Sequence, residues 1–127
     1  MACDYANERK QFGRPIASFQ LVQAMISDMV VKTDAARMLV WRATAMADLG
    51  QPNAKEASMA KAAAGKAAIA ACIDAIEICG AHGSIQDDHQ LLEKWFRDIK
   101  VYDIFEGTGN IQRIVISKRI LTGLKSF

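Results

Sequence analysis

Small and apolar residues recur at alternating steps of three and four along the first half of the chain. They are Phe19, Val22, Ile26, Met29, Thr33, Ala36, Val40, Ala43 and Ala47. This spacing keeps one face of an α-helix turned toward a packing partner. Pro15 and Ser18 precede the pattern and Gly50 and Pro52 follow it, and residues of these types open and close helices. The sequence therefore predicts one long helix over residues 18–49.

A second helix is expected from Asn53 to Cys79. Asn53 can accept hydrogen bonds from the first free amides and Glu56 can reach back to it, in the manner of a capping box. Alanines dominate residues 54–75, so this helix has a thin surface that lets neighbouring backbones approach closely. Gly80 is expected to end it, because glycine accepts the left-handed conformation after the last turn.

The rest of the chain is also predicted to be helical. Residues 80–89 are expected to form a polar loop, after which helical spacing returns from Leu91 to Ile104. Two glycines in Phe105–Asn110 break that helix, and a last helix is expected over 111–121. Residues 1–10 have a helical composition with no N-cap before them, so we expect the end of a helix that begins outside this sequence. The predicted fold is all-α, an antiparallel four-helix bundle, in a single domain over 1–127.

Composition excludes several classes of protein. The 127 residues are 51% hydrophobic and 24% charged, which suits one folded domain rather than disorder. A net charge of +2 gives no electrostatic reason to expect nucleic acid as a partner, and no apolar run reaches the roughly 18 residues of a membrane span. Cys3, Cys72 and Cys79 form no metal-binding pair and no signal peptide is visible, so we expect a cytoplasmic protein, or a mitochondrial matrix protein in a eukaryote. Cys72 and Cys79 are expected to pack as small apolar groups.

Glu106 is the residue whose surroundings best suit acid–base chemistry. It follows two apolar residues at the predicted helix break and precedes glycines that let another molecule approach its carboxylate. A carboxylate withdrawn from water there would be a stronger base, as the removal of a proton from carbon requires. The alternative is a solvated turn residue, and Glu106 alone does not decide between the two.

Two other segments contain residue types that bind ligands. Arg9–Gly13 places cations beside an aromatic ring, which would suit a planar ligand with phosphates, although a helix end followed by a turn explains it equally well. Residues 80–83 contain glycines but lack the strand and the spacing of a dinucleotide-binding loop. The metal-ligand types nearby are His82, Asp87, Asp88 and His89. No two of these lie four residues apart on a secure helix, so we expect a structural loop and no metal site.

Five segments in a fixed order carry the most distinctive residues of the chain. They are Asp4–Ile16, Ser18–Gln20, Glu77–Gly83, Lys94–Asp98 and Phe105–Arg113. Together they resemble the acyl-CoA dehydrogenase family, over nearly the whole chain but only over the C-terminal helical domain of that family. We therefore expect the N-terminal helical domain and the middle β domain to lie outside these residues. The resemblance implies oxidation of an acyl-CoA thioester to the 2,3-enoyl-CoA, with FAD as hydride acceptor and an electron-transferring flavoprotein as the partner that reoxidises it.

The resemblance also implies roles for single residues. Glu106 matches the glutamate of a Tyr/Phe-Glu-Gly-Thr motif that removes the α-proton, and Gly107 matches the glycine beside the thioester. The residues matched to FAD contacts are Arg9, Gln11, Phe12, Gln20, Gly80, Thr108 and Asn110. Arg9 is expected to meet the FAD pyrophosphate from a neighbouring subunit. Thr108 and Asn110 are expected near a helix N-terminus, where a phosphate is favoured.

Two residues depart from the family pattern. Glu77 stands where the family usually has glutamine, and Ala81 stands where it usually has a second glycine. A carboxylate at position 77 would repel a pyrophosphate unless it is protonated or paired. Gly80 and Gly83 are expected to keep this loop flexible.

The expected function is that of an FAD-dependent acyl-CoA dehydrogenase of fatty acid metabolism, working as a homo-oligomer, either a dimer or a tetramer. We expect the 127 residues to be inactive by themselves. One alternative is a non-catalytic helical oligomerisation module derived from this family. An acyl-CoA oxidase relative is a further alternative, disfavoured because no extra C-terminal domain is visible.

Overall fold

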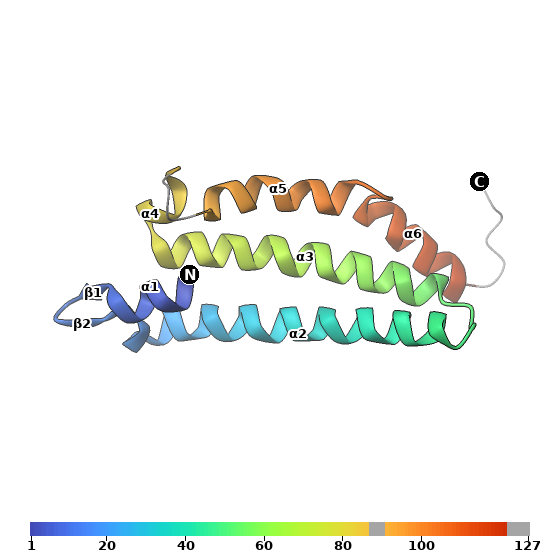
Figure 1. The fold of residues 1–127 in the computed structure, drawn as a ribbon, viewed down its shortest axis with the longest axis horizontal. Helices are drawn as coiled ribbons and strands as arrows, with labels where there is room; N and C mark the ends of the chain where they lie inside the picture. The colour runs from blue at the N-terminus through green and yellow to red at the C-terminus, as the bar shows by residue number, and fades with distance from the viewer. Residues whose placement is uncertain (87–90, 122–127) are drawn as a thin grey trace.

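A computed structural model describes residues 1–86 and 91–121, and Figure 1 shows its long helices lying along one another. The elements in chain order are α1 (Ala2–Glu8), β1 (Lys10–Gln11), β2 (Arg14–Pro15), the 3-10 turn η1 (Ile16–Ser18), α2 (Gln20–Asp48), α3 (Ala54–Cys79), α4 (Ala81–Ser84), α5 (Leu92–Ile104) and α6 (Gly109–Ile120). The predicted all-α fold is confirmed. Asp87, Asp88 and His89, which the sequence offered as metal-ligand types, lie outside the described residues.

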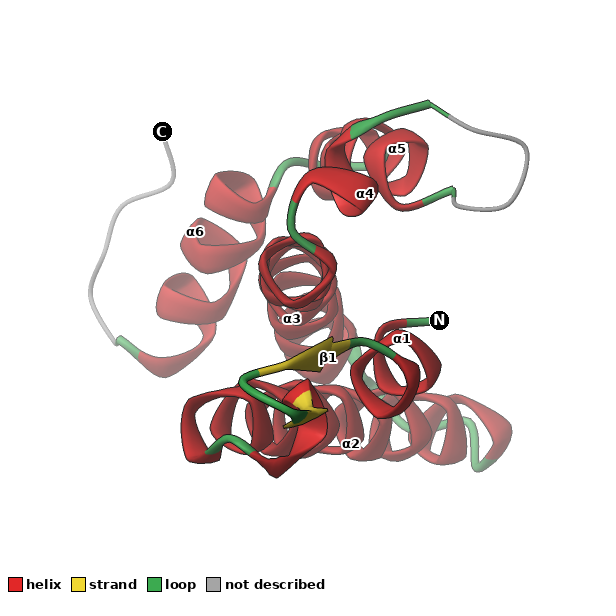
Figure 2. Ribbon diagram, turned by 90° about the vertical axis from the view of Figure 1, so that its left-hand side faces the viewer, coloured by secondary structure: helices red, strands yellow, loops and turns green. Residues whose placement is uncertain are grey.

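Helix α3 is the centre of the arrangement. It packs against α2 on one side and against α5 and α6 on the other, and α5 and α6 follow one another along its length. Figure 2 shows this end-on, with α3 between α2 and the last two helices. The turn between α5 and α6 is thereby placed over the body of α3 rather than at an end of the molecule.

The contact between α2 and α3 is made by small side chains. Ala36 and Ala43 of α2 are buried, and Ala63, Ala67 and Ala70 of α3 line a groove together with residues of α2, as expected from the thin surface of the alanine-rich segment. Helix α2 begins two residues later than the sequence predicts, because residues 16–18 form a 3-10 turn before it.

The predicted capping box at the start of α3 is wrong. The side chain of Asn53 does not cap the helix but donates from Nδ2 to the carbonyl oxygen of Ala43 on α2, at 2.8 Å. The Glu56 carboxylate is buried and lies 3.3 Å from the Arg42 guanidinium and 3.2 Å from the Lys55 ammonium. Both side chains therefore connect the beginning of α3 to α2. Each has a partner on α2 in place of the expected partner within the first turn of α3.

The apolar core lies at the end of the molecule where α1, α3 and α5 meet. Its buried members are Ala2, Ala6, Ala75, Ile78, Cys79 and Leu92. Cys79 is 2% exposed and Cys72 is half-buried. The expected packing as a small apolar group is confirmed for Cys79, which belongs to this core, and burial raises the pKa of both thiols.

Two local structures differ from the prediction. Residues 10–15 form an antiparallel hairpin with two residues in each strand. The sequence did not predict it, because strands this short show no alternation. Phe12 and Gly13 at its tip have φ angles of 51° and 77°, which suit the tight turn. Residues 81–84 form the short helix α4 rather than a loop.

Gly83 does not keep its segment flexible, contrary to the expectation. It is buried in α4, where a Cβ atom would come within 2.9 Å of the Cα atom of Ile76 on α3. Gly83 therefore allows α4 to pack directly on the α3 backbone. Gly80 does close α3 as expected, with a φ angle of 61°.

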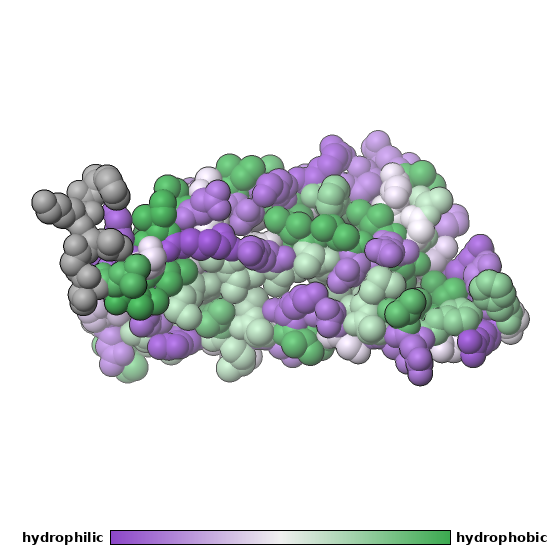
Figure 3. All heavy atoms as spheres, turned by 180° about the vertical axis from the view of Figure 1, so that it is seen from behind, coloured by the Kyte–Doolittle hydropathy of each residue, from purple (hydrophilic) through white to green (hydrophobic). Residues whose placement is uncertain are grey.

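Within the described residues, no helix is long and apolar enough to cross a membrane. The same residues contain no group of three or more His, Cys, Asp or Glu side chains that could hold a metal ion. Large apolar side chains remain exposed on α2, among them Leu21, Val31 and Trp41. Figure 3 shows apolar residues gathered in broad patches on the face that it presents.

Candidate functional site

Glu106 lies in the turn between α5 and α6. Its side chain is exposed, and its backbone has a φ angle of 54°, in the left-handed region. Gly107 continues this conformation with a φ angle of 93°. A left-handed backbone costs a residue other than glycine about 1–2 kcal/mol, so surrounding contacts must hold Glu106 in it. The described residues do not withdraw its carboxylate from water, so the expected desolvation is not provided by this chain.

The first turn of α6 supplies contacts that hold the turn. Thr108 is the N-cap of α6, and its Oγ1 accepts a hydrogen bond from the amide of Ile111 at 3.2 Å. The side-chain amide of Gln112 reaches back and donates from Nε2 to the carbonyl oxygen of Gly107 at 3.1 Å, with a longer approach of 3.4 Å to the carbonyl oxygen of Glu106. Asn110 is exposed in the same first turn, so Thr108 and Asn110 do lie at a helix N-terminus, as expected.

Helix α3 contacts the residues just before the α5–α6 turn through Lys61. The Nζ of Lys61 donates to the carbonyl oxygen of Tyr102 and lies 4.7 Å from the ring centre of Phe105. The rings of Tyr102 and Phe105 meet edge to face, with their centres 5.1 Å apart. Phe105, the residue before Glu106, is thereby fixed from two sides. A depression of about 350 Å³, lined in part by Tyr102 and Phe105, lies beside it.

Asp103 fills the space between α3 and α6 beneath this turn. A Cβ atom on either Gly65 of α3 or Gly109 of α6 would lie 2.7 Å from the Asp103 Oδ1. The Lys100 ammonium lies 3.2 Å from the other carboxylate oxygen of Asp103. Both glycines therefore leave room for the Asp103 carboxylate between α3 and α6.

The other predicted site residues lie near the C-terminal end of α3. Arg9, Gln11 and Phe12 are exposed on or beside the β1–β2 hairpin, and Phe12 is 91% exposed. Its ring meets that of Phe19, which also lies 4.4 Å from the guanidinium of Arg14. Gln20, the first residue of α2, and Gly80, after the last residue of α3, are exposed as well. This end therefore exposes cations and an aromatic ring, residue types that can bind a planar ligand with phosphates.

The structure does not bring these two groups of residues together within one chain. Figure 1 shows the hairpin at one end of the molecule and the α5–α6 turn well along α3 from it. Gly65, beneath the turn, and Gly80, near the hairpin end, are both on or directly after α3. At a rise of 1.5 Å per residue they are about 22 Å apart. A single ligand that contacts both groups must therefore span this distance or lie between two copies of the chain.

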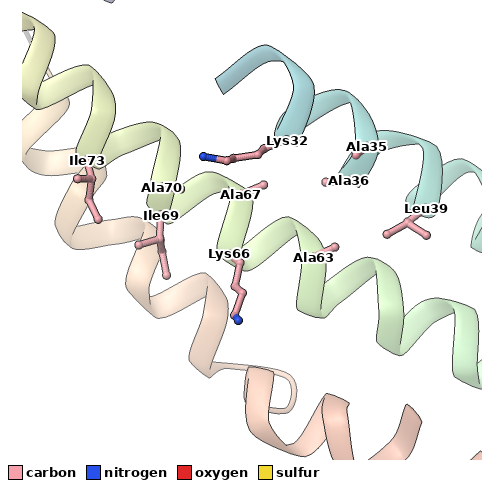
Figure 4. A pocket seen from close by; sticks show the side chains of 10 residues that line it. All are labelled: Lys32, Ala35, Ala36, Leu39, Ala63, Lys66, Ala67, Ile69, Ala70 and Ile73. Atoms are coloured by element: carbon pink, nitrogen blue, oxygen red, sulfur yellow. The ribbon is translucent and has the colours of Figure 1, made fainter. Parts of the chain in front are cut away.

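The apolar groove between α2 and α3 is separate from both groups. Its volume is about 500 Å³ and its lining is Lys32, Ala35, Ala36, Leu39, Ala63, Lys66, Ala67, Ile69, Ala70 and Ile73. Figure 4 shows these side chains, half of which are alanines. The Lys32 ammonium is paired with Asp28 at 2.8 Å. The lining contains no carboxylate, imidazole or thiol, so the groove is not the catalytic candidate.

Sequence reasoning missed the residues that support Glu106. Gln112, Asp103 and Lys61 had no assigned role, although Gln112 stood within a distinctive segment. The signal for Gln112 was its place in the first turn of a helix, with an amide long enough to reach the preceding turn. No local sequence pattern indicates the roles of Asp103 and Lys61, because their partners come from distant parts of the chain.

The fold and the site define a helical domain that presents a carboxylate at a turn between two helices. The family described as "Acyl-CoA dehydrogenase, C-terminal domain" matches residues 1–121. The acyl-CoA dehydrogenase of Bacillus subtilis (strain 168) is 46% identical over 122 residues, which cover 96% of this chain and 32% of that protein. The chain therefore belongs to the acyl-CoA dehydrogenase family and corresponds to its C-terminal domain.

Two solved structures extend the comparison. A structure reported for the electron-transferring flavoprotein of Acidaminococcus fermentans contains a chain with a TM-score of 0.90 and 39% identity, covering 95% of this chain and 31% of that one. The FAD complex of PigA matches with a TM-score of 0.88 and 29% identity, covering 94% of this chain and 30% of that one. FAD is the cofactor of the family. The chain spans about a third of the length of the relatives that it matches.

Proposed function

We propose that this chain is the C-terminal domain of an FAD-dependent acyl-CoA dehydrogenase and that Glu106 is its catalytic base. The observation that carries the proposal is the backbone at Glu106, which is held left-handed in the turn before α6 while its side chain is exposed. Strain of this kind is maintained where a side chain must take one position for function. Membership of the family supports the assignment.

The chemistry falls to the Glu106 carboxylate. It takes the proton from the carbon next to the thioester carbonyl, and the electron pair of that bond forms the new carbon–carbon double bond as the β-hydrogen leaves with its pair. When bound, FAD accepts that β-hydrogen as hydride. The exposed carboxylate becomes a strong enough base only when water is removed from around it, so we assign that role to the acyl-CoA and to parts of the enzyme outside these residues.

The exposed residues that the sequence matched to FAD contacts have side chains of types that can bind its parts. An exposed aromatic ring on the hairpin suits a planar group and Arg9 suits a pyrophosphate, while the N-terminus of α6 at Thr108 and Asn110 suits an oxygen-rich nucleotide. Because the hairpin and the α5–α6 turn lie about 22 Å apart along α3, we propose that each FAD is contacted by the hairpin of one subunit and by the turn of another. This requires a homo-oligomer.

The partners follow from the same proposal. We propose an acyl-CoA as substrate and an electron-transferring flavoprotein as electron acceptor, which agrees with the similarity to a chain in a structure reported for such a flavoprotein. The three cysteines are free, which agrees with a reducing compartment such as the cytoplasm, or the mitochondrial matrix in a eukaryote.

The test is anaerobic titration of the full-length protein with a panel of acyl-CoA thioesters, followed by the flavin absorbance. Fast bleaching in the natural protein and only a slow residual bleaching in Glu106→Gln, with FAD still bound in both, would support the proposal. Equal bleaching in both proteins would remove Glu106 from the reaction. A full-length protein that binds no FAD would instead be a non-catalytic helical assembly module.

A further inference from the structure

We infer that Gln112 is a positioning residue for Glu106, acting through the backbone of the turn and touching neither substrate nor FAD. This rests on the proposed function, in which Glu106 is the base. The side-chain Nε2 of Gln112 donates to the carbonyl oxygen of Gly107 at 3.1 Å and lies 3.4 Å from the carbonyl oxygen of Glu106. Both of these consecutive residues have a left-handed backbone. One amide therefore contacts the part of the chain that sets the direction of the Glu106 side chain.

The close approach of this amide depends on Gly107. A Cβ atom at position 107 would lie 2.7 Å from Nε2 of Gln112. The glycine after Glu106 therefore has a second reason to be glycine besides its φ angle of 93°. The space that its missing side chain leaves is filled by the amide that holds the turn.

The other end of Gln112 is anchored in α6. Its backbone amide donates to the carbonyl oxygen of Thr108 at 2.9 Å, in the first turn of the helix. Arg113, the next residue, donates from its guanidinium to the carbonyl oxygen of Gly109 at 2.6 Å and so stabilises the same turn. The Gln112 side chain thus connects the first turn of α6 to the two residues before it, in the way that a supporting group fixes a catalytic one.

The test uses two variants in the full-length protein. Gln112→Met keeps the length of the side chain and removes its donors, whereas Gln112→Asn keeps the amide but is one methylene too short. Both are expected to lower the rate constant of flavin reduction at saturating acyl-CoA by about 10- to 100-fold, because misplacing a reacting group by about 1 Å costs that much. FAD content and acyl-CoA affinity are expected to stay unchanged. Gln51→Met, at an exposed glutamine between α2 and α3, is the matched control and is expected to keep the natural rate.

A double-mutant cycle separates positioning from a general structural effect. In a Glu106→Gln background, Gln112→Met is expected to cause no further loss of the slow residual flavin reduction, because it acts through the Glu106 carboxylate. A further loss of the same size would overturn the inference, as would flavin reduction at the natural rate in both Gln112 variants. If Glu106→Gln itself keeps the natural rate, the proposed function of Glu106 fails first and the inference about Gln112 fails with it.

Discussion

At the scale of single residues, two glycines allow the contribution of the Gln112 contact to be measured. Gly50 and Gly107 both have left-handed backbones, with φ angles of 66° and 93°. A Cβ atom at position 50 meets nothing within 4 Å, whereas one at position 107 meets the Gln112 amide. Gly50→Ala is expected to lower the free energy of unfolding only by the backbone cost of about 1–2 kcal/mol. Gly107→Ala is expected to lower it by more, because its methyl group also meets Gln112. Thermal unfolding of the two variants checks this. Equal losses of stability would show that the Gln112 side chain moves aside without cost.

The cysteines give a second prediction at this scale. Burial raises the pKa of the Cys79 thiol and also shields it, whereas Cys3 is exposed. At about pH 8 we expect iodoacetamide to leave Cys79 unmodified in the folded protein and to alkylate it once urea unfolds the chain. Peptide mass mapping measures this site by site. Alkylation of Cys79 as fast in the folded as in the unfolded protein would contradict the packing described here.

At the scale of elements, α4 packs on α3 through a glycine. Gly83→Ala would push a methyl group against the Ile76 backbone, which cannot move aside as a side chain can. We expect a loss of about 1–3 kcal/mol, the usual cost of overpacking. Ser84→Ala, at an exposed position of the same helix, is the matched control and is expected to be nearly neutral. Calorimetric unfolding of both variants measures the difference, and a neutral Gly83→Ala would refute the close contact.

The junction of α2 and α3 carries a prediction about pH. A hydrogen bond from its own backbone amide, then the Lys55 and Arg42 charges, hold the pKa of the Glu56 carboxyl below its usual 4.5. A depressed pKa in the folded state means that the stabilisation is complete above about pH 4.5, the unfolded value, and is lost as the pH falls through the lower folded value. Glu56→Gln should therefore flatten the acid limb of the stability curve.

Glu8→Gln is the control for that measurement, since Glu8 is exposed at the end of α1. Thermal midpoints recorded between neutral and strongly acidic pH give the curve for each variant. An acid limb that is the same in Glu56→Gln as in the natural protein would show that the ion pairs of Glu56 add nothing to stability.

The sequence predicted the elements better than their contacts. The periodic apolar face and the glycine at position 80 locate α2 and the end of α3 because both signals are local. The capping box at Asn53 and Glu56 failed because partners on α2, distant in sequence, competed for the same side chains. The resemblance named Glu106, but its support by Gln112, Asp103 and Lys61 depends on how three helices meet, which no local pattern records.

At the scale of the whole molecule, the separation of the two ligand-facing groups predicts complementation between subunits. If Arg9 of one subunit and Glu106 of another serve the same site, each of the variants Arg9→Ala and Glu106→Gln is impaired alone. A mixed oligomer of the two contains sites in which both residues are natural. We expect coexpressed subunits, purified through two different tags, to be clearly more active than either variant by itself. Activity no higher than that of the better variant would place both residues of a site in one subunit.

The central claim is that Glu106 removes a proton from carbon, and exchange of that proton tests it most directly. A 3-thia-acyl-CoA has no hydrogen on a β-carbon to transfer, so only the proton step remains. In D₂O, the full-length protein is expected to exchange the α-protons of this compound, as followed by proton NMR, and Glu106→Gln with FAD still bound is expected to lose that exchange. Exchange at the natural rate in Glu106→Gln would contradict the account and assign the base to another residue.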